Sequence, residues 1–144
     1  RLGTEQPIPV TSPSGTELWA GLLGNASAMQ VRIGLAPKDL PGFVQAHSAE
    51  LASQSFLADI ANGLVYIAAE IADTQQASAW LEKLRRHALA LGGYAMVTQM
   101  PAQWENTIDR WGYHPESIDL MRRLKARWDP AGILGAGTFV VDHP

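Results

Sequence analysis

Arg32 is the side chain in this sequence whose chemistry best suits a small ligand. It lies in residues 29–35, where apolar and polar side chains alternate with the period of a strand buried on one face. Arg32 is then expected on the outer face, where its guanidinium can bind a small carboxylate through two parallel hydrogen bonds. Tyr66 and Glu70 are predicted to share that face from a second strand. The alternative is an ion pair between Arg32 and Glu70 or Asp59 across the sheet.

Other chemistry finds little support in the residue types. The four histidines are far apart and lack metal-ligand spacing, so we predict no metal site. His47 is expected to be a hydrogen-bonded core side chain, and His87 lies near a predicted helix C-terminus, where a cation is favoured. The absence of cysteine excludes disulfides and thiol nucleophiles. No nucleophile-elbow, P-loop or dinucleotide-binding motif occurs, and Gly135-Ala136-Gly137 is too short to bind a phosphate alone.

Length and charge are those of a single soluble domain. The 144 residues carry 11 Lys and Arg against 14 Asp and Glu, a formal net charge of -3, which argues against nucleic-acid binding. No apolar run approaches the roughly 18 residues that a membrane-spanning helix needs. The chain begins at Arg1 with no apolar segment behind it, so no signal peptide is visible and a piece of a longer protein is suspected.

The hydrophobic period predicts the elements that position Arg32. Residues 1–15, rich in Pro, Gly, Ser and Thr, are predicted to be a linker or extended arm, and residues 16–144 the compact domain, which opens with a short helix over 16–23. The next elements are a strand over 29–35, a helix over 40–51, strands over 56–60 and 64–71 joined at Asn62-Gly63, a helix over 77–91 and a strand over 94–100. This order predicts an α+β, ferredoxin-like βαββαβ fold, an antiparallel sheet with both helices on one face.

Three further elements are predicted after the sheet: helices over 102–111 and 115–128, and an extended segment over 138–141. Trp104, Trp111 and Trp128 lie in the two helices and are expected to form an interface. Leu124 is expected to pack into the core.

The end of the chain resembles the closing motif of FAD-linked oxidases of the vanillyl-alcohol-oxidase type. In that motif a helix carrying Leu-Lys runs into Asp-Pro-x-Gly-Ile-Leu and then Asn-Pro-Gly. Here the matching residues are Leu124-Lys125, Asp129-Pro130 and Gly132-Ile133-Leu134. The chain is most similar to the smaller FAD-binding subunit of bacterial glycolate oxidase, which it resembles over about residues 29–141, including Gly92-Gly93-Tyr94, Pro101 and Trp111-Gly112.

This resemblance implies that residues 16–144 are the C-terminal cap, or substrate, domain of a FAD-dependent oxidoreductase, without its N-terminal FAD-binding domain. Such enzymes oxidise a small 2-hydroxy acid such as glycolate by hydride transfer to flavin. Arg32 would bind the substrate carboxylate with Tyr66 and Glu70 beside it, and the catalytic base is not identified. Gly135 and Gly137 replace the Asn-Pro-Gly of the family, which leaves backbone contacts to the cofactor.

The resemblance also implies partners. These are the FAD-binding domain, towards which the terminal segment folds back, and other glycolate-oxidase-type subunits, including an iron–sulfur subunit. The expected location is cytoplasmic, or peripheral at the inner membrane through those subunits, and the chain alone is expected to be inactive. Two alternatives stay open: a non-enzymatic ferredoxin-like domain that binds a small ligand, and an assembly domain whose Trp-rich helices dock on a catalytic partner.

Overall fold

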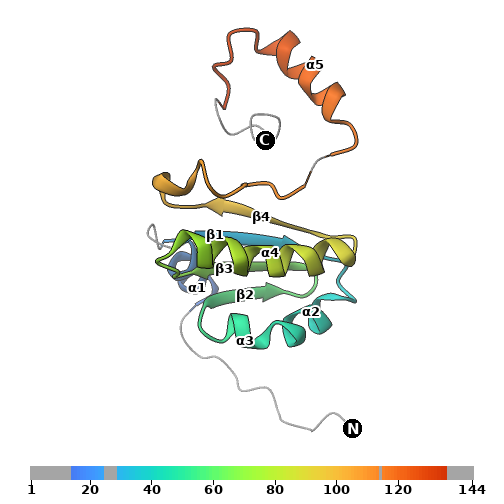
Figure 1. Ribbon diagram of the computed structural model, residues 1–144. Coiled ribbons are helices and arrows are strands. Elements are labelled where there is room, and N and C mark those ends of the chain that lie inside the picture. The colour runs from blue at the N-terminus through green and yellow to red at the C-terminus, as the bar shows by residue number, and fades with distance from the viewer. Residues whose placement is uncertain (1–13, 25–28, 114, 136–144) are drawn as a thin grey trace, which may run out of the picture.

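The computed structural model describes residues 14–24, 29–113 and 115–135. Its centre is a four-stranded antiparallel sheet with the strand order β2-β3-β1-β4 (Figure 1). The strands are β1 (Met29–Gly34), β2 (Ser55–Asp59), β3 (Leu64–Ala69) and β4 (Tyr94–Gln99). The helices are α1 (Gly15–Leu23), α2 (Leu40–Ala46), α3 (Ser48–Leu51), α4 (Thr74–Ala90) and α5 (Ile118–Trp128), with a 3-10 turn, η1, at Ala102–Trp104. The α+β class is confirmed, and the elements up to β4 follow the predicted order.

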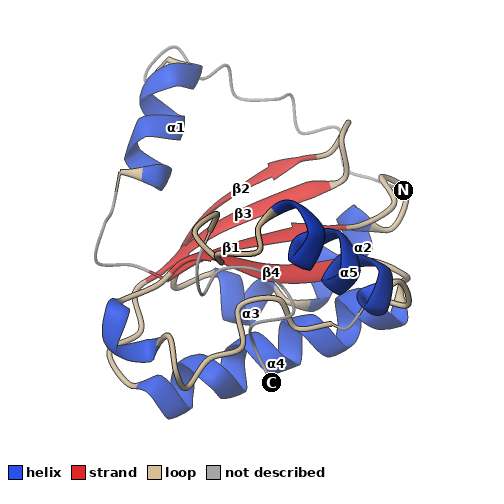
Figure 2. Ribbon diagram, turned by 90° about the horizontal axis from the view of Figure 1, so that it is seen from above, coloured by secondary structure: helices blue, strands red, loops and turns tan. Residues whose placement is uncertain are grey.

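The main core lies between one face of the sheet and the helices α2, α3 and α4 (Figure 2). Every second residue of β1, β3 and β4 points into it, as the strand period requires. The fully buried side chains of this layer include Val31, Ile33, Val65, Ile67 and Val97 from the sheet and Phe43, Leu51, Leu81 and Leu84 from the helices. The alternation that predicted the strands is therefore the alternation of buried and outward side chains.

The predicted helix over 40–51 is two short helices that meet at His47. His47 has φ -106° and ψ 19°, outside helical values, so α2 ends there and α3 begins at the next residue. Its buried ring lies against His87 of α4, which confirms the core position expected for His47. Helix α4 itself is continuous, and the Asp73 carboxylate caps it by accepting a hydrogen bond from the Gln76 N–H.

Helix α1 lies on the opposite face of the sheet from α2–α4 (Figure 2). Ser14 and Glu17 form a reciprocal capping box that fixes its first turn, so Ser14 and Gly15, predicted to end the arm, belong to this helix. Residues 1–13 lie outside the described residues. Trp19 and Leu22 pack on β2 and β3. The prediction that the helices leave this face open is therefore wrong for its β2–β3 half.

The predicted helix over 102–111 is wrong, because only η1 is helical and turns follow it. Trp104 is 6% exposed and Ile108 is 3% exposed, so both side chains belong to the core. Trp104 is therefore a core residue, not part of an interface. The backbone N–H of Val97 donates to the Arg110 carbonyl, so the segment after η1 also covers part of the free edge of β4.

Buried Arg85 holds this segment in place. Its Nε donates to the Ala95 carbonyl over 3.0 Å and its Nη2 donates to the Asp109 carbonyl over 2.5 Å. The Asp109 carboxylate accepts the N–H groups of Trp111 and Gly112. Gly112 has φ +71°, and a Cβ there would lie 2.2 Å from Arg85 Nε, so this position requires glycine.

Helix α5 lies apart from the sheet, beyond β4 (Figure 1). No residue of α5 is buried, which contradicts the prediction that Leu124 packs into the core. Leu124 is 36% exposed and Trp128 is 73% exposed. The extended segment predicted over 138–141 lies outside the described residues. Within residues 14–24, 29–113 and 115–135, no helix combines the length and apolar character needed to cross a bilayer.

Candidate functional site

Arg32 lies at the middle of the outer face of the sheet, where the alternation of β1 predicts it. It pairs with Tyr66 on β3 and with Met96 on β4, and Leu57 on β2 pairs in turn with Tyr66. One row of outward side chains therefore runs across all four strands. The sequence prediction that Arg32 and Tyr66 share one face is consistent with this register.

The Arg32 guanidinium is held by β4. Its Nη2 lies 3.1 Å from the Met96 sulfur, and its Cζ lies 5.7 Å from the centroid of the Tyr94 ring, within the range of a cation–π contact. The Tyr94 ring covers Gly34, since a Cβ at position 34 would lie 2.4 Å from Tyr94 Cε1. Nε of Arg32 is buried and has no hydrogen-bond partner. The guanidinium is thus fixed in position with unused hydrogen-bonding capacity.

Neither carboxylate proposed as an alternative partner reaches Arg32. Asp59 instead accepts hydrogen bonds from the side chain and backbone N–H of Asn62. Glu70 follows the last residue of β3, four residues beyond Tyr66, which places it roughly 13 Å along the strand from Arg32. Within the described part of the chain, Arg32 forms no ion pair with a carboxylate. The structure therefore brings Arg32 and Tyr66 together and leaves Glu70 apart.

Trp19 is a component of this face that the sequence analysis missed. Its ring meets the Tyr66 ring edge-on, with centroids 4.7 Å apart and an interplanar angle of 78°. The available signal was the Ser14–Glu17 capping box, which marks α1 as a stable helix start. No sequence pattern tells which face of the sheet such a helix covers. With Trp19 and Tyr66 on one side and Tyr94 and Met96 on the other, Arg32 lies between two sets of large side chains.

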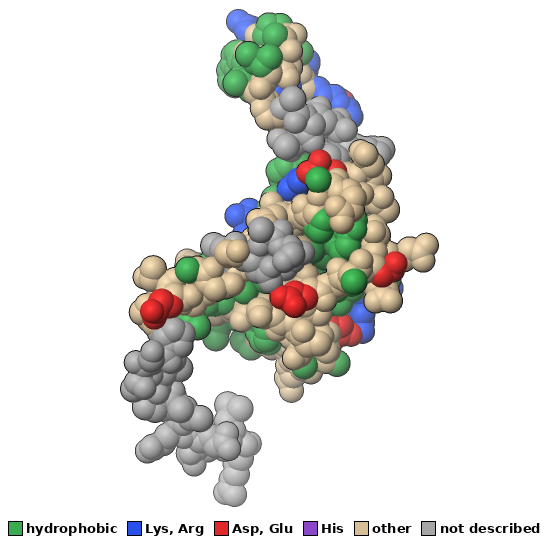
Figure 3. Space-filling model, turned by 90° about the vertical axis from the view of Figure 1, so that its left-hand side faces the viewer, with side chains coloured by type: hydrophobic (Ala, Val, Ile, Leu, Met, Phe, Trp, Pro, Cys, Tyr) green, Lys and Arg blue, Asp and Glu red, His purple; other side chains and the backbone are tan. Residues whose placement is uncertain are grey.

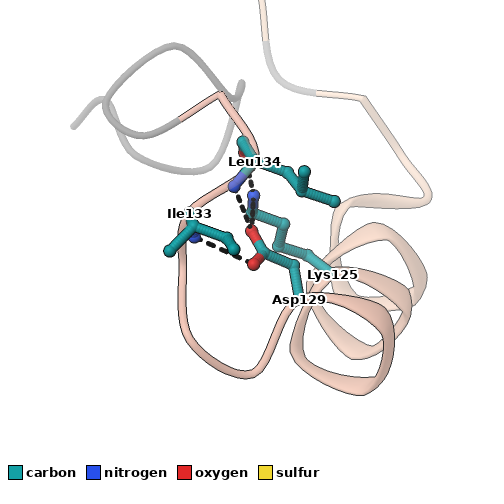
Figure 4. A network of polar contacts seen from close by, with 4 residues as sticks. All are labelled: Lys125, Asp129, Ile133 and Leu134. Atoms are coloured by element: carbon teal, nitrogen blue, oxygen red, sulfur yellow. Dashed lines mark hydrogen bonds and ion pairs between the residues drawn. The ribbon is translucent and has the colours of Figure 1, made fainter.

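The residues of the closing motif form a network of polar contacts, shown in Figure 4. Lys125 Nζ donates to the Asp129 carboxylate and to the Leu134 carbonyl. The same carboxylate accepts the N–H groups of Ile133 and Leu134, each over 2.9 Å. Asp129 is only 7% exposed, and the Lys125 ammonium and these two N–H groups hold the pKa of its carboxyl below the ordinary value. We call residues 125–134 the hook.

The hook and α5 enclose an apolar groove of about 330 Å³, lined by Met121, Leu124, Lys125, Trp128, Asp129 and Leu134. Ile133 is 77% exposed and Leu134 is 63% exposed. Figure 3 shows hydrophobic side chains gathered at the α5 end of the molecule with basic side chains beside them. Arg122, Arg123 and Arg127 are exposed on the same helix. An amphipathic helix with an uncovered apolar face is typical of a docking surface.

The described residues do not by themselves fit a FAD molecule. Gly135, with φ +59°, offers backbone only, and Gly137 lies outside the described residues. The groove beside Gly135 is lined chiefly by hydrocarbon, and Lys125 is already engaged within the hook. A dinucleotide needs polar groups and backbone N–H donors for its phosphates, so most of the contacts to a flavin would come from outside these residues.

Neither metal-ligating side chains nor comparisons with known proteins add a residue to this site. In the described ranges, no three His, Asp or Glu side chains are arranged to hold a metal ion. No protein-family model and no curated protein matches the sequence.

Proposed function

We propose that this chain is the cap, or substrate, domain of a FAD-dependent oxidoreductase that oxidises a small 2-hydroxy acid such as glycolate. The observation that carries the proposal is the hook. Lys125 and Asp129, the polar residues of the oxidase-like motif, form its network, and Gly132 adopts φ +65°. In this proposal the network fixes the turn after α5, so that α5 and the groove face the flavin domain.

Arg32 supports the substrate class. A guanidinium that is half-buried, fixed by Met96 and Tyr94 and without an ion pair to any carboxylate of the described residues suits a small anion. In this proposal Arg32 binds the carboxylate of the acid and orients its α-carbon, while Tyr66 and Trp19 form one wall. Glu70 lies too far along β3 to touch the same small molecule. We assign no catalytic base.

The flavin is proposed to be held by an N-terminal FAD-binding domain that precedes this chain in the whole protein. A flavin held there would supply the acceptor for the hydride that leaves the α-carbon of the substrate. The contribution of this chain is to bind and orient the acid and, through the hook, to dock on that domain. A place among glycolate-oxidase-type subunits, one of them an iron–sulfur protein, and a cytoplasmic or peripheral inner-membrane location belong to the same proposal.

The test uses the whole gene product that contains this sequence, purified without added cofactor. The proposal predicts flavin absorbance between roughly 350 and 500 nm that bleaches when glycolate is added without oxygen. Ethane-1,2-diol, which has the hydroxyl but no carboxylate, should bleach it far more slowly because Arg32 has nothing to bind. A colourless protein, or a flavin that glycolate leaves oxidised, would contradict the proposal.

The exposure of Trp128 favours one alternative, an assembly domain that docks on a catalytic partner through the groove. That function needs the hook but not Arg32. It therefore predicts that the whole protein binds its partner normally when Arg32 is replaced, and that it contains no flavin of its own.

A further inference from the structure

The rings of His47 and His87 join the segment containing α2 and α3 to α4. Nε2 of His47 lies 2.9 Å from Nδ1 of His87. His47 is 4% exposed, and the Phe43 ring contacts both imidazoles, with centroid distances of 4.6 and 5.2 Å. Within this hydrogen bond one ring must donate and the other must accept. The contact therefore requires at least one neutral imidazole.

Besides His87, the charged groups that act on His47 are Glu50 from α3 and Lys83 from α4. Glu50 Oε2 lies 3.7 Å from His47 Nδ1, too far for a hydrogen bond, and Glu50 Oε1 is already paired with Lys83. His47 Nδ1 is buried without a hydrogen-bond partner. Burial and the neighbouring His87 lower the pKa of His47, and the attraction of Glu50 opposes this shift only in part.

We propose that the His47–His87 contact is an acid-sensitive latch that holds residues 40–51 against α4 and opens when both rings carry a proton. A first proton is tolerated, because a charged ring can still donate to a neutral one and Glu50 lies near. A second proton removes the acceptor and places two like charges at hydrogen-bond distance. Because His47 is buried, water reaches a cation on its ring only if residues 40–51 move away from α4.

The direction of the pH effect follows from proton counting. In the unfolded chain both histidines take up protons near pH 6.5, whereas the closed latch takes up fewer. The closed state is therefore fully stable above this pH and loses stability as the pH falls below it. Each proton that the closed state excludes lowers its equilibrium constant by about tenfold per pH unit.

The test combines urea unfolding of the full 144-residue chain between pH 7.5 and 5 with amide hydrogen exchange. In His87→Gln the amide stays uncharged and can still bond to His47, so the folding constant should fall by about fivefold less between pH 6.5 and 5.5 than in the wild-type chain. Arg86→Gln, an exposed neighbour on α4, should keep the wild-type slope.

Hydrogen exchange locates the opening. The N–H groups of His47 and Leu51 donate to Phe43 and His47 carbonyls, and at pH 5.5 they should lose protection relative to the β1 amides of the same sample. Equal pH slopes for the wild type and His87→Gln would overturn the latch. Unchanged protection of these two amides relative to β1 would overturn it as well, and this second measurement needs only the wild-type chain.

Discussion

Lys125 lies on α5, and Asp129 follows the last residue of that helix, one turn later. Their side chains form an ion pair that also holds residues 133 and 134. The carboxylate accepts the backbone N–H groups of Ile133 and Leu134 while Lys125 reaches the Leu134 carbonyl. One buried carboxylate thus closes the turn formed by residues 129–134. The same carboxylate holds Leu134, which lines one side of the groove.

Replacing Asp129 by Asn should open the hook. Asn keeps one acceptor oxygen but loses the charge that binds Lys125 and one of the two acceptors for N–H groups. We expect faster trypsin cleavage after Lys125 and Arg127 and faster amide exchange at Ile133 and Leu134, with little change in the sheet.

The matched control is Asp119→Asn, because the exposed Asp119 carboxylate pairs with Arg122 at the other end of α5, while Arg123 donates to the Asp119 backbone carbonyl, which asparagine keeps. It should leave cleavage after Lys125 unchanged. An Asp129→Asn chain that is cleaved at the wild-type rate would mean that the carboxylate does not hold the hook.

Leu124 and Leu84 should respond very differently to truncation. Leu84 is fully buried in the core, so Leu84→Ala should lower the free energy of unfolding by about 2–5 kcal/mol. Leu124 is 36% exposed on α5, so Leu124→Ala should cost less than about 1 kcal/mol in this chain. Urea unfolding measures both values. Equal losses would place α5 in the core and contradict the exposed groove.

The strands and α4 could be predicted because their hydrophobic periods coincide with their burial. After β4 the hydrophobic period led to a wrong prediction. Trp104 and Ile108 have helical spacing, but their buried side chains belong to a 3-10 turn and the turns after it, which Arg85 and Asp109 hold in place. That arrangement depends on contacts between residues far apart in sequence. The hydrophobic period also misplaced Leu124, for another reason. An apolar stripe indicates that a helix face avoids water, but it does not tell which surface covers that face.

The outward position of Arg32 could be predicted from the alternation in β1, but its surroundings could not. The contacts to Met96 and Tyr94 depend on the register between β1 and β4, which the sequence pattern does not specify. Glu70 lies an even number of residues after Tyr66, so strand alternation assigns both side chains to one face. The distance of Glu70 from Arg32 becomes known only from the pairing of β1 with β3.

Gly112→Ala should destabilise the fold. Alanine is strained at φ +71°, and its Cβ would meet the buried Arg85 side chain. We expect a loss of at least about 1–3 kcal/mol in the free energy of unfolding. Gly42→Ala is the control, since Gly42 lies in α2 and an alanine Cβ there would have no other atom within 4 Å, so this substitution should be neutral or stabilising by up to about 1 kcal/mol. Thermal unfolding that ranks the two variants the other way would be inconsistent with the Arg85 contact.

The Trp19–Tyr66 contact should hold α1 on the outer face. A double-mutant cycle with Trp19→Leu and Tyr66→Leu should give a coupling energy of about 0.5–1.5 kcal/mol, the range for edge-to-face aromatic pairs. Amide exchange of α1 should also accelerate in Trp19→Leu. A coupling energy of zero would show that α1 does not depend on this pair.

The measurement that tests the central claim most directly is the rate of anaerobic flavin bleaching in the whole protein as a function of glycolate concentration, for the wild type, Arg32→Ala and Arg86→Gln. Loss of a charge-assisted bond of roughly 1.5–3 kcal/mol predicts that Arg32→Ala needs about 10- to 100-fold more glycolate for half-maximal rate. Arg86→Gln, exposed on α4, should match the wild type. Wild-type concentration dependence in Arg32→Ala would contradict the assignment of Arg32 to the substrate carboxylate.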